Sequence, residues 1–421
     1  MNERTPAAAE HAPHADGRPE ICASGDAGEK PADTLPVVGI RTDANTAIAT
    51  GHLRRCLTIA DALRGRAELV FFVSDEESAE LLFAFSENYP CRVLHTDYRN
   101  PKEEAADYLI GRPLPQNGRI PGADRSSLRL SEAGSSLRLS EAGSSLREPL
   151  RLPDLLLLDS YYVTPGRFRF LSSVAPVCYL DDLMQYDHPA ALIVNYDPAP
   201  APGFYRSAGK VLAGACYAPL RPEFAAAGAA YSVCPEAREL LITTGGTDPL
   251  DLSGRLVRLL LEEPALRGLQ HIHLVLGALS SRRDALAALA ASSPRVCLHE
   301  NVQNMAALMA SCDLAVSAAG TTLYELCAVG LPSVAFSLSG EQTKTASDFD
   351  RAGAVPFCGD LRREHGEPVL SSICGHLKEL AGSGSFDRRS ALSRRMRTLT
   401  DGLGAGRIAD AILAVPRRTD L

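Results

Sequence analysis

The chain lacks the features that mark several large classes of protein. Its 421 residues contain no run of about 18 apolar residues, which a membrane-spanning helix requires. The formal net charge of −8 gives no excess of basic residues, so a nucleic-acid partner is not expected. None of the eleven cysteines forms a Cys-x-x-Cys pair, and Cys and His do not follow zinc-ligand spacing. The sequence therefore predicts neither a membrane span nor a bound metal.

The beginning of the sequence also lacks the pattern of a secretion signal. Residues 1–12 are polar and alanine-rich, with no apolar central region. Several cysteines, among them Cys178, Cys297 and Cys327, lie in apolar runs, which is typical of buried reduced thiols. Both observations predict a cytoplasmic protein.

Two segments differ in composition from the rest of the chain. Residues 1–35 are rich in Ala, Pro, Gly and acidic residues, so we expect a disordered tail there. Between residues 112 and 148 the nonapeptide SSLRLSEAG starts at Ser126 and again at Ser135, and its first four residues recur at Ser144. Solenoids need more and longer repeats. We interpret residues 112–148 as a surface insertion in a loop; a weak amphipathic helix that binds a partner is the alternative.

Strand-like and helix-like segments alternate along the remaining sequence, which is typical of an α/β fold with parallel sheets. We expect an N-terminal Rossmann-like domain over residues 36–230, a second one over 231–380 and a helical segment over 381–421. Ligands in such domains bind at the carboxyl ends of the strands, which here would face a cleft between the domains. The expected strands are Val37–Ile40, Leu69–Val73, Leu155–Leu158, Val177–Leu180, Ala191–Val194, Leu240–Thr243, Ile272–Leu276, Asp313–Ser317 and Ser333–Phe336.

A histidine stands at the expected start of the first helix. Leu53, Cys56, Leu57 and later apolar residues follow at helical spacing, so the helix begins close to His52. Free backbone N–H groups at such a start attract phosphate, and the same positive dipole end disfavours an imidazolium. A neutral imidazole can take a proton from water, so His52 is a candidate general base. A histidine that caps the helix in a structural turn is the alternative.

A glycine-bearing loop follows the first expected strand of the second half. In Gly245-Gly246-Thr247-Asp248 the glycines let the backbone approach a phosphate, and Thr247 can donate a hydrogen bond. Asp248, which precedes Pro249, equally suits a helix N-cap. The loop is not a Gly-x-Gly-x-x-Gly fingerprint, which argues against a nicotinamide cofactor. No cofactor is expected.

A second loop carries a stronger nucleotide signal. The strand that ends near Ser317 leads through small residues into a helix that opens with Gly320-Thr321-Thr322. Backbone N–H groups and the two hydroxyls can surround a diphosphate. Glu325, one turn into the helix, could accept both hydroxyls of a ribose; favourable charge placement in a first helical turn is the alternative. Gln342 follows the next strand and could contact sugar or phosphate.

Eight ordered blocks of residues together resemble one family over roughly residues 37–360, the UDP-sugar hydrolases of pseudaminic acid biosynthesis. Order and rough spacing agree, apart from the insertion at residues 112–148. The blocks are Arg41-x-Asp43 with Gly51-His52-x-x-Arg55-Cys56-Leu57, then Leu158-Asp159-Ser160-Tyr161, Leu180-Asp181-Asp182, Asn195, Tyr217-Ala218-x-Leu220-Arg221-x-Glu223-Phe224, Gly245-Gly246-Thr247-Asp248, Glu300-Asn301-Val302-x-Asn304-Met305 and the segment from Ser317 to Glu325.

The resemblance implies a GT-B fold, similar to that of the transferase that adds N-acetylglucosamine to lipid I. It implies hydrolysis of UDP-2,4-diacetamido-2,4,6-trideoxy-β-L-altropyranose to UDP and the free sugar. His52 occupies the family's general-base position, and Tyr161 matches a position near the sugar. Asp159, also a candidate catalytic residue, precedes Tyr161 in a block where Ser160 replaces the histidine that the family often has.

The remaining matches fall on the side of the substrate and its nucleotide. Glu325 corresponds to a nucleotide-ribose position. The other substrate-side and nucleotide-side residues in these blocks are Gly51, Arg55, Gly245, Gly246, Thr247, Gly320, Thr321 and Thr322. Gln342, which lies outside the blocks, is a candidate from its position alone.

Other functions remain open on this sequence. A glycosyltransferase that uses a UDP-sugar donor has the same architecture, as has a UDP-sugar epimerase, because fold does not fix the reaction. A non-catalytic subunit that binds a nucleotide sugar is a further alternative. The expected small-molecule partner is a UDP-sugar, with association with other enzymes of the same sugar pathway left open.

Overall fold

The computed structural model describes most of the chain from Leu35 onward. The expected tail before Leu35, the nonapeptide repeat and Thr247 lie outside the described residues. The described residues are 35–45, 48, 50–99, 153–201, 203–246, 248, 250–277, 280, 282–363 and 366–417.

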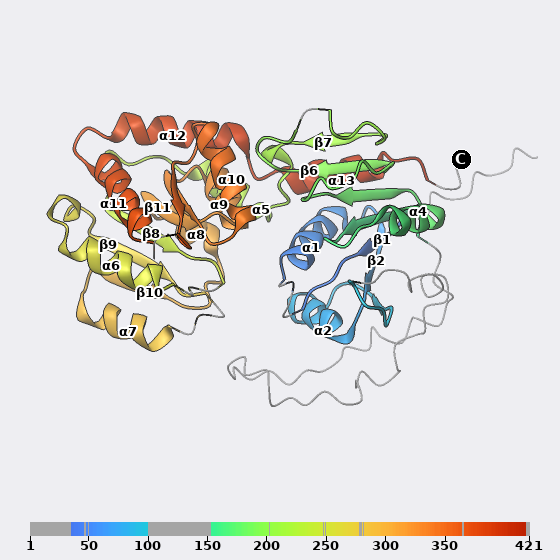
Figure 1. Cartoon of the computed structure of the whole chain (residues 1–421), viewed down its shortest axis with the longest axis horizontal. Coiled ribbons are helices and arrows are strands. Elements are labelled where there is room, and N and C mark those ends of the chain that lie inside the picture. The colour runs from blue at the N-terminus through green and yellow to red at the C-terminus, as the bar shows by residue number, and fades with distance from the viewer. Residues whose placement is uncertain are drawn as a thin grey trace, which may run out of the picture. The chain divides into compact units, whose positions relative to one another are not determined.

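The first half is built on a parallel sheet of seven strands in the order β3-β2-β1-β4-β5-β6-β7 (Figure 1). The central strands are runs of Val, Ile and Leu that are buried along their whole length, as strands covered on both faces must be. The strands are β1 (Val37–Arg41), β2 (Glu68–Val73), β3 (Cys91–Val93), β4 (Leu155–Asp159), β5 (Val177–Leu180), β6 (Leu192–Asn195) and β7 (Val211–Ala213).

The second half repeats this plan with a parallel sheet of six strands in the order β10-β9-β8-β11-β12-β13. Two parallel sheets with crossover helices confirm the expected α/β class. The strands are β8 (Glu239–Thr243), β9 (His271–Val275), β10 (Val296–His299), β11 (Leu314–Ala318), β12 (Ser333–Ser337) and β13 (Phe357–Asp360).

Helices link most successive strands, although β5, β6 and β7 follow one another without a helix. Two helices begin where the sequence indicated, at Gly51 and Thr321. No described helix has the length and apolarity that a membrane span would need. The helices are α1 (Gly51–Leu63), α2 (Glu76–Phe85), α4 (Pro165–Val174), α5 (Pro222–Ala230), α6 (Leu252–Glu262), α7 (Arg283–Ser292), α8 (Met305–Ala310), α9 (Thr321–Val329), α10 (Gly340–Arg351), α11 (Glu367–Ala381), α12 (Phe386–Leu399) and α13 (Gly404–Leu413).

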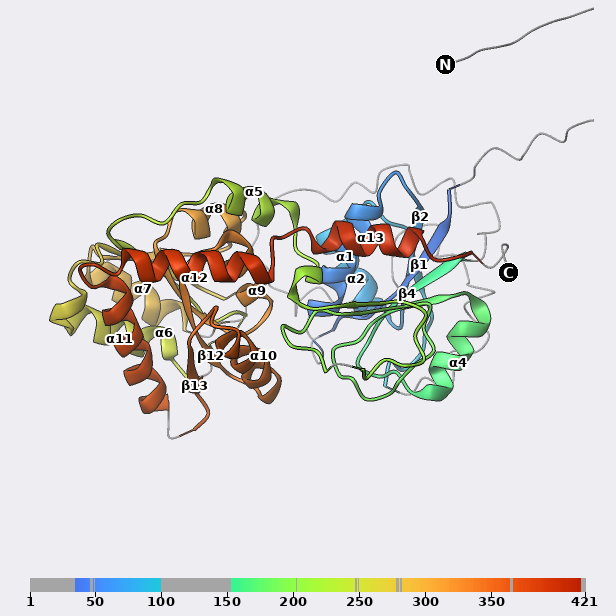
Figure 2. The same ribbon diagram turned by 90° about the horizontal axis from the view of Figure 1, so that it is seen from above.

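The last helix packs on the first one (Figure 2). Ile408 and Ile412 of α13 belong to the same buried cluster as Leu53 and Ile59 of α1. Helix α13 therefore completes the core of the first sheet, whereas α12 packs on α9. Helix α5 precedes the second sheet in the sequence but packs on α8 and α9, two helices of the second half.

Candidate active site

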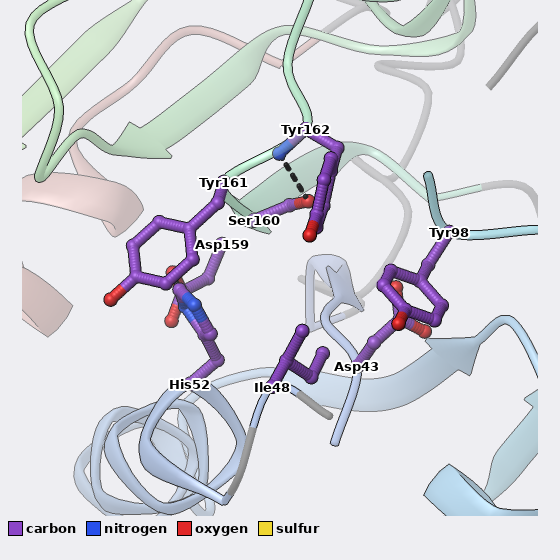
Figure 3. A pocket seen from close by; sticks show the side chains of 8 residues that line it. All are labelled: Asp43, Ile48, His52, Tyr98, Asp159, Ser160, Tyr161 and Tyr162. Carbon is purple, nitrogen blue, oxygen red and sulfur yellow. Dashed lines mark hydrogen bonds and ion pairs between the residues drawn. The ribbon is translucent and has the colours of Figure 1, made fainter. Parts of the chain in front are cut away.

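His52 and Asp159 meet at the carboxyl ends of two neighbouring strands. Strand β1 leads into the loop before α1, and β4, which pairs with β1, ends at Asp159. His52 is the second residue of α1. Its Nδ1 lies 2.7 Å from Oδ1 of Asp159, and both side chains are buried (Figure 3). The fold thus brings together two residues that the sequence predicted separately.

Arg55, one turn further along α1, binds the same carboxylate. Its Nε donates to Oδ2 of Asp159 at 2.6 Å, and its Nη2 donates to Oδ1 at 2.5 Å. Its Nη1 donates to Oδ2 of Asp182 at 2.6 Å and to the hydroxyl of Tyr196. All three nitrogens of the guanidinium are therefore directed at protein groups, and Nη2 also lies 2.8 Å from Nδ1 of His52.

This arrangement determines the charge of Asp159. Burial would raise the pKa of Asp159, but the Arg55 guanidinium and His52 outweigh that effect and hold the pKa below its usual range. At neutral pH Asp159 is therefore a carboxylate, which can only accept hydrogen bonds. Nδ1 of His52 lies 2.7 Å from Oδ1 of Asp159, an acceptor, and 2.8 Å from Nη2 of Arg55, a donor. We assign the ring proton to Nδ1 because the ionised carboxylate is the nearer partner and can only accept, which leaves the lone pair on Nε2.

Aromatic residues form the walls around His52. The Tyr161 ring meets the imidazole edge-on, with 4.2 Å between ring centroids, and is 39% exposed. Burial raises the pKa of Tyr161 to about 12, so its phenol stays protonated. We call this hollow the His52 pocket (Figure 3). It is lined by Asp43, Ile48, His52, Tyr98, Asp159, Ser160, Tyr161 and Tyr162.

The loop after β8 turns at Gly245 and lies close to Gly277. Gly245 has a φ of +81°, and a side chain at Gly277 would lie 2.3 Å from the Gly245 carbonyl oxygen. Asp248 accepts from the backbone N–H groups of Leu252 and Ser253, both at 2.9 Å. Asp248 therefore holds the first turn of α6 through its side chain, although the N-cap residue of this helix is Asp251, three positions later than the sequence suggested.

The loop after β11 leads into α9 at Thr321, with Gly320 as N-cap and Gly330, at φ +80°, ending the helix. No side chain caps the first turn of this helix. Glu325 is half-buried on α9, and burial raises its pKa to about 7, with Arg221 acting in the opposite direction. Glu325 is thus a carboxyl group whose charge changes near neutral pH.

Gln342 takes part in the start of α10. Its side-chain Oε1 accepts a hydrogen bond from the backbone N–H of Leu338 at 2.8 Å, and its backbone N–H donates to Ser339 Oγ at 3.2 Å. This reciprocal pattern resembles a capping box, so it gives Gln342 a structural role independent of any ligand.

Several residues of the site carried no signal in the sequence. Tyr98 and Tyr162, whose rings lie 5.4 Å apart, enter the His52 pocket from two distant segments. Tyr196 is the first residue after β6, so its place at the carboxyl end of a strand was the one available hint. Within the described ranges, no three His, Cys, Asp or Glu side chains are grouped so as to hold a metal ion.

Two curated proteins are similar in sequence to part of this chain. No family model matches the chain. It is 27% identical over 199 residues to the spore coat polysaccharide biosynthesis protein SpsG of Bacillus subtilis. The aligned region covers 47% of this chain and 57% of that protein. It is 29% identical over 199 residues to the UDP-N-acetylglucosamine--N-acetylmuramyl-(pentapeptide) pyrophosphoryl-undecaprenol N-acetylglucosamine transferase of Salinibacter ruber, covering 46% of this chain and 50% of that one. The chain thus spans about half the length of these curated relatives.

Solved structures match over nearly the whole chain. Acinetobacter baumannii MurG superposes with a TM-score of 0.55 and 16% identity, covering 90% of this chain and 99% of that one. The calicheamicin glycosyltransferase CalG4 gives a TM-score of 0.53 and 14% identity, covering 91% and 100%. The two Rossmann-like domains therefore have a GT-B, glycosyltransferase-like fold, as expected.

Proposed function

We propose that the chain is an enzyme that acts on a UDP-sugar and cleaves the bond between the anomeric carbon and the diphosphate. The observation that carries this proposal is the 2.7 Å contact between His52 and Asp159, both of which line the His52 pocket. A histidine held by a buried carboxylate is the arrangement that accepts a proton from an attacking oxygen.

The chemistry follows from three side chains, those of His52, Asp159 and Arg55. An oxygen nucleophile attacks the anomeric carbon while its proton passes to Nε2 of His52, and the carbon–oxygen bond to UDP breaks with its electron pair leaving on the diphosphate. Asp159 stabilises the imidazolium that forms, and Arg55 keeps Asp159 ionised. Since UDP is a good leaving group, no strong acid is required.

The nucleotide is assigned to the second sheet. Backbone N–H groups at the start of α9, with Thr321 and Thr322, would receive the diphosphate, and Gly245 and Gly246 would let it approach the loop after β8. Gly51 and Gly320 are positions where a side chain would meet nothing within 4 Å, which leaves room for a ligand. Glu325 would accept the ribose hydroxyls.

Transfer of the sugar to an acceptor hydroxyl is the reaction that the relatives support better. One of them is named as an N-acetylglucosamine transferase that uses a UDP donor, and the fold is that of glycosyltransferases. Hydrolysis, with water as the nucleophile, is the second candidate. The eight residue blocks favour it, because His52 and Tyr161 both fall at positions matched to the hydrolase family.

One experiment separates these reactions. Purified protein is incubated with a panel of UDP-sugars, including UDP-N-acetylglucosamine and UDP-diacetamido sugars, with and without acceptor alcohols, and UDP release is followed. Release only with an acceptor supports transfer, and equal release without one supports hydrolysis. No release from any donor, while UDP itself binds, would contradict cleavage and leave a binding protein.

A further inference from the structure

Tyr196 stands between the ion pairs of the His52 pocket and the helix that carries Glu325. Its hydroxyl accepts a hydrogen bond from Nη1 of Arg55, and the guanidinium lies 5.6 Å from the centre of its ring. On the other side its ring meets that of Tyr324 edge-on, with 5.5 Å between centroids. Tyr324 is buried in α9, directly before Glu325.

Arg55 needs such a support because it bridges two carboxylates. Asp159 and Asp182 bind different edges of its guanidinium, at 2.6 Å each. A shift of the guanidinium toward Asp182 would lengthen its contacts with Asp159, and Asp159 fixes the His52 ring. The Tyr196 hydroxyl binds the same Nη1 that serves Asp182, so it limits this movement.

The neighbouring residue Asp197 adds a second connection to the same region. Its carboxylate pairs with Lys344 of α10, and Phe349 of α10 packs against Tyr324 with 5.1 Å between ring centroids. The segment that follows β6 is therefore held by both α9 and α10. A tyrosine anchored in this way presents its hydroxyl to Arg55 at a fixed position.

We infer that Tyr196 is a positioning residue, which acts through Arg55 to hold Asp159 on Nδ1 of His52. This inference deepens the proposed function and rests on it, since it assigns Tyr196 to the orientation of the proposed base. Tyr196 touches no reacting atom in this scheme. Its effect should appear in the turnover number and in the His52–Asp159 hydrogen bond, and should be absent from UDP binding.

The test compares Tyr196→Phe with Tyr205→Phe. Tyr205 is a matched control, because its hydroxyl bonds Asn195 at 2.8 Å and Asp181 at 3.0 Å at the same end of the sheet without reaching Arg55. We expect Tyr196→Phe to lower kcat about tenfold, with KM within about twofold of wild type. The effect should vanish in an Asp159→Asn background, because both changes remove the same support. Tyr205→Phe should leave kcat unchanged.

A second readout does not depend on activity. In protein labelled with 15N-histidine, the Nδ1 proton of His52 is identified by its loss in His52→Asn. Tyr196→Phe should shift or broaden this resonance, and Tyr205→Phe should leave it in place. If the wild type releases no UDP, the proposed function fails while this measurement still decides the role of Tyr196. An unchanged resonance in Tyr196→Phe, or a loss of kcat that adds independently to that of Asp159→Asn, overturns the inference.

Discussion

His52 Nδ1 and Asp159 Oδ1 lie 2.7 Å apart, although the two residues are separated by 107 positions in the sequence. The contact exists because β1 and β4 are adjacent parallel strands whose carboxyl ends share one edge of the sheet. The proposed roles of His52, Asp159 and Arg55 follow from that adjacency.

Asp159→Asn tests the charge at this contact. The neutral amide no longer balances the positive charge of Arg55. It also no longer selects the Nδ1–H form of His52, because an amide can donate as well as accept. We expect kcat to fall by about 10²-fold or more, and the free energy of unfolding to fall by about 2–3 kcal/mol. Kinetics and urea denaturation measure the two effects. Asp410→Asn is the control, since its pair with Arg66 is exposed and should contribute less than about 1 kcal/mol. Equal losses in the two variants would contradict the assignment.

Glu325 should make nucleotide binding depend on pH. The folded protein holds its pKa at about 7, and the ribose hydroxyls need the ionised form as acceptor. Below this pKa Glu325 is protonated, and binding has to include the free-energy cost of removing that proton. UDP affinity should therefore rise with pH up to about 7 and then level off. Because the terminal phosphate of UDP titrates near pH 6 as well, the quantity to compare by calorimetry is the ratio of wild type to Glu325→Gln. A ratio that stays constant between about pH 5.5 and 8 would remove Glu325 from the ribose role.

Gly228→Ala should destabilise the contact between α5 and α9. A side chain at Gly228 would lie 2.2 Å from the carbonyl oxygen of Ala328, so one helix would have to move. We expect a loss of about 1–3 kcal/mol in the free energy of unfolding. Gly406→Ala, at an exposed helical glycine where a side chain would meet nothing within 4 Å, should instead stabilise by about 0.5–1 kcal/mol. A neutral Gly228→Ala would show that α5 is held more loosely than described.

The sequence predicted the interior strands of both sheets and missed the edges. The nine expected strands correspond to β1, β2, β4, β5, β6, β8, β9, β11 and β12, each with neighbours on both sides. The four unpredicted strands, β3, β7, β10 and β13, are the sheet edges, and they are only three or four residues long and partly exposed. An edge strand needs no continuous apolar run, so periodicity gives little signal there.

The candidate site was predictable to a similar degree. His52 stood out because a glycine-bearing loop and an amphipathic helix bracket it, and Glu325 because it follows a small-residue loop. The carboxylate–guanidinium network was not predictable, because the distance between Arg55 and Asp182 depends on the order of strands in space. The packing of α13 on α1 was missed for the same reason, since apolar periodicity shows that a helix has a buried face without showing what covers it.

The central claim is that His52 takes the proton of the attacking oxygen, and the most direct measurement is the turnover of His52→Asn on the best UDP-sugar donor. We predict that kcat falls by about 10²–10⁴-fold while UDP affinity stays within about twofold of wild type. His271→Asn, at a half-exposed histidine on β9, serves as the control and should turn over like wild type. Undiminished turnover in His52→Asn would contradict the proposed role of His52 as the base.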